Sequence, residues 1–252
     1  MRTVIGRPLL GDARRIPAGL TVAACVTVVV ALGLLFTGQT GPDWLDNAID
    51  SPVITFFGGR SLLLWLAFPG TLIPAAAVSA AIVIACLITR RLNGAVLAAI
   101  AVPVAAGVGD GLLKPLFHRT YLGQVAFPSG HTASATALTA TLAVLALVPP
   151  QQARTRAARV TLVAVACVIT AAVAVGVIGL RWHYFTDCLA GVAVGTGTVL
   201  ALAFLIDLAP VVISSARKLP ANRSPKRPAP SATSSYANGP SEGTVSPREA
   251  RS

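Results

Sequence analysis

The sequence contains little charge and very little acid. Of its 252 residues, 12% are charged, only 9 are Asp or Glu, and 54% are hydrophobic. An average soluble domain is about 25% charged. This shortage excludes an ordinary soluble domain and indicates a membrane protein.

Cysteine is also scarce, which excludes two further classes of protein. The four cysteines all lie within or at the edge of apolar stretches: Cys25, Cys86, Cys167 and Cys188. Their spacing matches no metal site, and a disulfide framework is not expected. We interpret them as small hydrophobic side chains.

Long apolar stretches are what the sequence has in abundance. Six of them approach the roughly 20 residues that a helix needs to cross a bilayer. They cover residues 17–37, 66–89, 95–113, 132–148, 160–180 and 188–206. The first is longer than a typical signal-peptide core and has no small-x-small cleavage site, so we expect it to be retained. The piece SLLLWLAF is set apart from the second stretch by Pro69-Gly70 and is expected to lie at the interface. The prediction is an all-α protein, a six-transmembrane-helix bundle.

The positive charges are distributed unequally between the two sides of these spans. The formal net charge is +11. If the spans alternate, sixteen of the 20 Lys and Arg residues fall on the side of both termini. This pattern predicts cytoplasmic termini, and it argues against nucleic-acid binding. The expected location is the plasma membrane. We divide the chain into a cytoplasmic segment 1–16, a membrane domain 17–210 and a Pro/Ser-rich basic tail 211–252, expected to be disordered.

Polar residues of particular types collect on the other, outer side. They fall in the two loops that join spans three to four and five to six: His118, His131, His183, Lys114, Arg119 and Arg181. Cations alone would be explained by snorkelling side chains. All three histidines together with three cations favour a functional site instead.

The stretch FPSGHT begins the fourth span. Ser129 is suited to cap the helix, Pro128 to its first turn, and Gly130 lets a ligand approach the backbone. The unpaired N–H groups of a helix start favour an anion, particularly phosphate. An ordinary helix cap would explain Ser and Pro, but not His131.

The stretch LRWHYFTDCLAG places His183 and Asp187 four residues apart. On a helix they would share a face, and an Asp that accepts from one ring nitrogen leaves the other free to attack. A buried His–Asp hydrogen bond of purely structural role is the alternative.

The stretch DGLLKPLFHRTY supplies cations for an anionic substrate. Lys114 and Arg119 are candidate phosphate ligands, and Asp110 is expected to pair with Lys114. The remaining outer acids, Asp43, Asp46 and Asp50, are expected to form a solvated loop, with cation binding as the weaker alternative. No metal site or cofactor is expected.

With these motifs, the sequence resembles the type 2 phosphatidic acid phosphatase superfamily. The family pattern is K-x6-R-P, then P-S-G-H, then S-R-x5-H-x3-D. The middle motif is complete at residues 128–131, the last keeps His183 and Asp187, and the first keeps Lys114. Two arginines depart from the pattern: Arg119 lies two residues early, and Arg181 lies one helical turn from the family position at Val177. The resemblance covers roughly residues 60–206.

The resemblance implies a mechanism. His183, oriented by Asp187, would attack phosphorus and form a phosphohistidine, while His131 would protonate the leaving oxygen and then activate water. Lys114, Arg119, Arg181, Ser129 and Gly130 would hold the phosphate oxygens. Phosphoryl transfer needs mainly such positioning and charge stabilisation. His118 has no place in the pattern and is expected to be a minor contributor or a bystander.

The substrate and the class of activity stay open at this point. A lipid phosphate or polyprenyl diphosphate, phosphatidic acid and phosphatidylglycerol phosphate all fit, and the oligomeric state is not indicated. The main hypothesis is hydrolysis at the outer face of the membrane. The alternatives are phosphotransfer to an alcohol, and a transporter or binder of anionic lipid without turnover. Separately, Gly191 and Gly195 predict close helix packing in the sixth span.

Overall fold

The computed structural model describes residues 8–57, 59–147 and 156–218, with backbone alone for 210–218. Its helices are α1 Asp12–Leu35, α2 Trp44–Phe56, α3 Arg60–Ala67, η1 Phe68–Gly70, α4 Leu72–Ile88, α5 Leu92–Ala106, η2 Gly107–Leu113, α6 Lys114–Phe117, α7 Gly130–Leu147, α8 Arg156–Gly179 and α9 Phe185–Lys218. A short hairpin of β1 Thr120–Tyr121 and β2 Gln124–Val125 precedes α7. The predicted all-α fold is confirmed.

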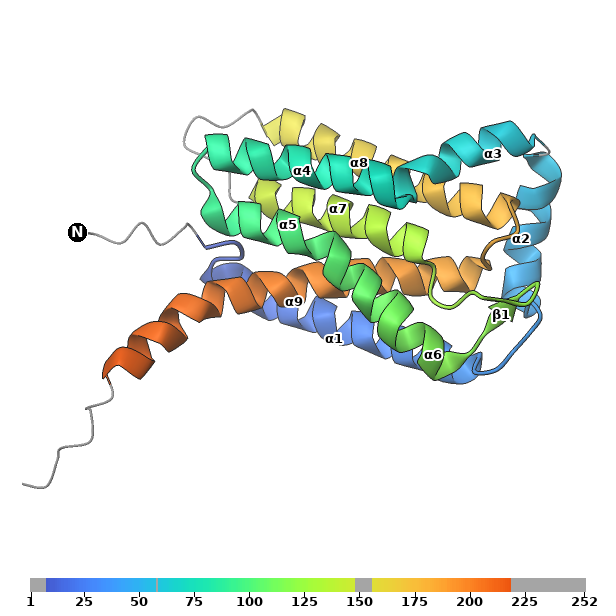
Figure 1. Ribbon diagram of the computed structural model, residues 1–252, viewed down its shortest axis with the longest axis horizontal. Helices are drawn as coiled ribbons and strands as arrows, with labels where there is room; N and C mark the ends of the chain where they lie inside the picture. Colours follow the sequence, from blue (N-terminus) through green and yellow to red (C-terminus); the bar gives the residue numbers. More distant parts are fainter. Residues whose placement is uncertain (1–7, 58, 148–155, 219–252) are drawn as a thin grey trace, which may run out of the picture.

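The long helices form one bundle, in which α7 lies between its neighbours α5, α8 and α9 (Figure 1). Small residues bring α9 close to α7. A Cβ atom on Gly191 would lie 2.6 Å from the carbonyl oxygen of Ser129, and one on Gly195 would lie 2.6 Å from that of Ala133. Only glycine permits this approach, so the predicted close packing of the sixth span is confirmed.

Four helical stretches in the described ranges are long and apolar enough to cross a membrane. They are Asp12–Leu35, Leu92–Phe117, Arg156–Gly179 and Phe185–Ala209, and a bent pair of α2 with α3–η1 is a possible fifth. Helix α4 is apolar but has only 17 residues. The sequence predicts six spans, and the helices that fall short of this test correspond to the second and fourth. Helix α7 is rich in Thr and faces the interior of the bundle, where polar groups are not exposed to lipid.

Helix α2 was not predicted, and the expectation of a solvated acidic loop there is wrong. Asp43 caps the helix: its side chain accepts from the backbone of Asp46, and the Asp46 side chain accepts from the backbone of Asp43. This is a reciprocal capping box. Asp46 and Asp50 are buried rather than solvated. They are buried because Arg119 and the first backbone N–H groups of α9 provide partners for them.

The first and last helices extend past residues 17 and 210, between which the membrane domain is predicted. Helix α1 begins at Asp12 and contains Pro17, and α9 continues to Lys218, past the predicted end at 210. The backbone N–H groups of Leu9 and Leu10 donate to the carboxylate of Asp207, which ties the segment before α1 to α9. The rest of the predicted tail, residues 219–252, lies outside the described residues.

Candidate active site

Two histidines from distant parts of the chain meet at one end of the bundle. His131 is in the first turn of α7, and His183 is in the loop between α8 and α9. Their ring centroids are 6.1 Å apart, and the ring of Trp182 lies 5.4 Å from that of His131. We call this the active-site end; it is on the right in Figure 1, beside α2 and α6.

The end of α8 determines where His183 points. The N–H of Arg181 donates to Ile178 O at 2.8 Å and that of Trp182 to Val177 O at 2.9 Å, while Arg181 has a φ of 61°. This is a Schellman ending, with Arg181 in the left-handed position that usually holds glycine. The chain therefore turns at Arg181, and His183 enters the bundle.

The same turn corrects one prediction about Arg181. The sequence argument required the helix to continue from Val177 to Arg181, but α8 ends at Gly179. Arg181 is exposed and does not line the pocket that contains the histidines. The structure does not bring it to the phosphate position.

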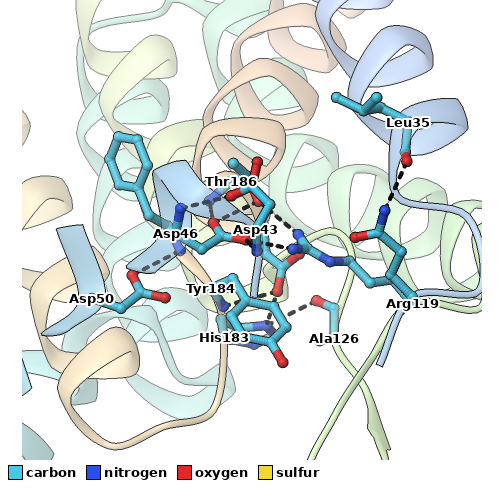
Figure 2. A network of polar contacts seen from close by, with 12 residues as sticks. Leu35, Asp43, Asp46, Asp50, Arg119, Ala126, His183, Tyr184 and Thr186 are labelled. Carbon is cyan, nitrogen blue, oxygen red and sulfur yellow. Dashed lines mark hydrogen bonds and ion pairs between the residues drawn. The ribbon is translucent and has the colours of Figure 1, made fainter. Parts of the chain in front are cut away.

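The imidazole of His183 is held by a backbone carbonyl. Its Nδ1 lies 2.8 Å from the carbonyl oxygen of Ala126, as Figure 2 shows. A carbonyl oxygen can only accept, so Nδ1 carries the proton and Nε2 is left with a free lone pair. The nearest carboxylate oxygen of Asp187 is 3.9 Å from Nδ1. The carbonyl of Ala126, and not the predicted carboxylate of Asp187, thus accepts the hydrogen bond that orients His183.

Burial keeps His183 neutral. The pKa of its imidazole is lowered to about 3, mainly by loss of solvent and in addition by the neighbouring His131 and Lys114. A charged imidazolium is disfavoured in a buried, electropositive place. At neutral pH the ring is therefore a free base, as a nucleophile must be.

Asp187 connects the parts of the site rather than touching the ring of His183. Its carboxylate accepts from Arg119 at 2.7 Å and from the backbone N–H of Tyr184 at 2.9 Å. Its backbone carbonyl accepts from the N–H of Ser129 at 3.0 Å. The start of α7 and the loop that carries His183 are thus fixed to one residue.

Arg119 is the centre of a buried polar network, and its predicted role as a phosphate ligand is not supported. The side chain is 0% exposed. Its guanidinium donates to Asp46, Asp187 and Thr186, and Figure 2 shows Arg119 pointing toward Asp46 and Thr186. It also lies 4.2 Å from the ring centroid of Phe36. Because Arg119 already binds two carboxylates and does not line the pocket, we interpret it as a residue that stabilises the fold.

Ser129 and Gly130 occupy different surroundings. Ser129 is 0% exposed, and its Oγ accepts from the N–H of Thr132 at 3.3 Å, so it caps α7 and does not face the pocket. Gly130 does line the pocket. A Cβ at Gly130 would lie 3.3 Å from a carboxylate oxygen of Asp110, so this carboxylate rests against the start of α7. Of the residues predicted for the anion position, Gly130 and His131 line the pocket, whereas Ser129 does not.

Lys114 and Asp110 form the ion pair that the sequence predicts. The Nζ of Lys114 lies 2.7 Å from Oδ1 of Asp110, and both residues line the pocket. They stand on either side of the junction between the π-helical turn η2 and α6. His118 ends α6 with a φ of 50°, is exposed, and does not line this pocket.

The pocket has a polar end and a long apolar end. Its volume is about 820 Å³. The polar end contains Asp110, Lys114, Gly130, His131, Ser134 and His183. From there the pocket continues as a groove between α4 and α5, lined by Ala76, Ala80, Val83, Ile84, Ala99 and Val102. One site thus combines a cation and two imidazoles with space for an apolar chain.

The pattern and this arrangement agree with a comparison against protein families. The model of the PAP2 superfamily matches residues 16–208. The chain belongs to the PAP2 superfamily. No curated protein and no solved structure matches it. Membership implies phosphatase-type phosphoryl hydrolysis, and the apolar helices indicate a membrane protein. Together they fit a phosphate substrate embedded in the membrane.

Several residues of this PAP2 site were missed by sequence reasoning. Asp46 and Asp50 were assigned to a loop, although Asp43 and Asp46 at N-cap and N3 are a capping signal. Ala126 contributes through its carbonyl, which no residue type reveals. In the described part of the chain, no group of three His, Cys, Asp or Glu residues is arranged to hold a metal ion.

Proposed function

We propose that this protein hydrolyses a lipid phosphate or diphosphate at the outer face of the membrane, through a phosphohistidine intermediate and without a metal ion. The observation that carries the proposal is the approach of His131 and His183, with ring centroids 6.1 Å apart, at the head of an apolar groove. That separation leaves room for a phosphoryl group between the rings.

The first step is attack on phosphorus. The free Nε2 of His183 forms the N–P bond while the P–O bond to the leaving group breaks. His131, when protonated, gives its proton to the departing oxygen. The imidazole becomes positively charged as it is phosphorylated, and its Nδ1–H remains bonded to Ala126. The negative carboxylate of Asp187, 3.9 Å from Nδ1, then stabilises this positive charge.

The second step reverses the roles. His131, now neutral, takes a proton from water, and the oxygen of that water attacks phosphorus. The N–P bond breaks, phosphate leaves and His183 returns to its neutral form. Division of the reaction into two steps is the usual benefit of a side-chain nucleophile.

Lys114 and the first turn of α7 are the groups that hold the equatorial oxygens. Lys114 is paired with Asp110, whose carboxylate lies against Gly130. Asp110 thus occupies the anion position in the free protein. An incoming phosphate would displace this carboxylate and take over Lys114 and the backbone N–H groups of the helix start.

The apolar groove supports a lipid as the substrate. It runs along α4 from Leu72 to Ile84, a rise of about 18 Å at 1.5 Å per residue. Small alanine side chains on both walls leave space for one extended hydrocarbon chain. The charge asymmetry supports an extracytoplasmic site, cytoplasmic termini and the plasma membrane as the location.

Phosphate release in detergent with EDTA tests the proposal. We expect purified wild-type protein to release phosphate from a lipid phosphate. In His183→Ala and His131→Ala the rate of release should fall by about 10²-fold or more. His118→Ala is the matched control, because His118 lies outside the pocket and should retain activity. Acid-labile ³²P on the wild type but not on His183→Ala would identify the intermediate. Undiminished release by both active-site variants would refute the assignment.

A further inference from the structure

A second groove lies at the opposite end of the bundle, where α8 begins (left in Figure 1). Its volume is about 650 Å³. Three arginines surround it, Arg14 from α1 and Arg156 and Arg159 from α8, and its floor is formed by alanine and valine side chains of α7 and α8. We call this the arginine groove.

Among the described residues, no carboxylate neutralises the positive charge of the arginine groove. Within the described ranges, none of its three arginines forms an ion pair with a carboxylate. The acids nearest in the fold are engaged elsewhere, Asp12 with Arg15 and Asp207 with the backbone of Leu9 and Leu10. One Nη of Arg159 donates to the carbonyl of Ala146 at 2.8 Å. The groove therefore presents donors without an acceptor.

An apolar cavity adjoins the arginine groove. A neighbouring cavity of about 530 Å³ lies among α7, α8 and α9, and Ala143 and Val163 line both spaces. Its walls are almost entirely apolar and include Val144, Ala171, Val192 and Leu200. Along α7 the two spaces extend from Ala146 to Thr136, a rise of about 15 Å. The arginines thus lie beside two adjoining spaces whose combined length along α7 is that of an acyl chain.

We infer that the arginine groove binds an anionic phospholipid of the leaflet opposite the active site. The phosphate of the head group would lie among Arg14, Arg156 and Arg159, and one acyl chain would lie in the cavity between α7 and α8. Arginine suits this role because its guanidinium binds phosphate oxygens in a bidentate way. The distribution of charge predicts that this leaflet is the cytoplasmic one, which carries the anionic lipids.

Two other occupants fit the site less well. A nucleic acid would not use an apolar channel that enters the bundle. Arginines that serve only to orient the chain in the membrane would need no cavity beneath them. What favours a lipid is the combination of three arginines that have no carboxylate partner in the described ranges with an apolar cavity beside them.

Thermal unfolding of the delipidated full-length protein tests the inference. Wild type in neutral detergent is titrated with phosphatidylglycerol, with phosphatidylcholine, and with inorganic phosphate. We expect phosphatidylglycerol alone to raise the unfolding temperature. In Arg156→Gln/Arg159→Gln, the concentration for half of the effect should rise about tenfold or more. The control is Arg15→Gln/Arg90→Asn, which removes the same charge from the same end of the protein but outside the groove.

Each outcome decides the inference. Loss of the effect in the groove variant, with the control like wild type, supports it. Equal weakening in both variants would mean general attraction between charges and would overturn it. Stabilisation by inorganic phosphate alone, or equally by phosphatidylcholine, would overturn the lipid as the ligand. His183→Ala should respond to phosphatidylglycerol as wild type does, which separates this site from the proposed catalytic one.

Discussion

Arg119 and Asp187 form an ion pair of 2.7 Å with both side chains closed to solvent. Asp46 binds the same guanidinium from α2. Replacement by Met should leave two buried carboxylates without a cation, which costs about 3–5 kcal/mol. We therefore expect Arg119→Met to lower the thermal unfolding temperature in detergent strongly, and Asp46→Asn in the same chain to restore part of it.

The matched control is Arg181→Gln. Arg181 is exposed, so its replacement should change stability by no more than about 0.5 kcal/mol. If Arg119→Met had wild-type stability and a raised KM for the phosphate substrate, Arg119 would be a phosphate ligand, as the sequence predicts.

The pair of Asp110 and Lys114 makes a prediction about phosphate affinity. Because Asp110 rests at the start of α7 and holds Lys114, Asp110→Asn should strengthen competitive inhibition by inorganic phosphate. The gain should be about fivefold at most, since a partly exposed ion pair contributes up to about 1 kcal/mol. Lys114→Gln should lower kcat/KM by about 10²-fold. Weaker inhibition in Asp110→Asn would show that this carboxylate aids phosphate binding instead.

Gly191 makes a prediction about helix packing. A Cβ there would lie 2.6 Å from the carbonyl of Ser129, so Gly191→Ala must push α9 away from the start of α7. We expect a loss of about 1–3 kcal/mol in stability, and lower activity because His131 moves with Ser129. Gly111→Ala is the control, since nothing lies within 4 Å of the added methyl. Equal stability of the two variants would contradict the close contact.

The fold and the centre of the site were accessible from the sequence because they depend on patterns. Apolar runs predicted the helices of the bundle, and the G-x3-G spacing of Gly191 and Gly195 predicted the close contact between α9 and α7. The PSGH motif and His183 gave the meeting of two histidines. These features are local in the chain or follow from the alternation of spans.

The rest depends on contacts that residue identity does not encode. Asp46 looked like a solvated acid, but a distant cation made its burial favourable. Arg119 resembled a phosphate ligand because the sequence does not show that Asp46 and Asp187 bind its guanidinium. The turn at Arg181 was missed because a left-handed residue at a helix end is normally signalled by glycine.

The buried, neutral state of His183 makes a prediction about pH and stability. Its pKa is lowered to about 3 in the folded protein by burial, from 6.5 in an unfolded chain. Between these values the unfolded chain binds a proton that the folded protein does not, so stability falls as pH decreases through that range. From pH 7.5 to pH 5 this one group should lower the free energy of unfolding by about 2 kcal/mol.

His183→Asn keeps a donor for Ala126 but does not titrate. The free energy of unfolding of this variant should therefore fall by about 2 kcal/mol less than that of wild type over the same interval. Denaturation of both proteins in detergent at the two pH values measures the difference, with His118→Asn as the control that removes a histidine outside the pocket. If wild type and His183→Asn lose stability in parallel, the imidazole is not held neutral, and its proposed role as the resting nucleophile fails with it.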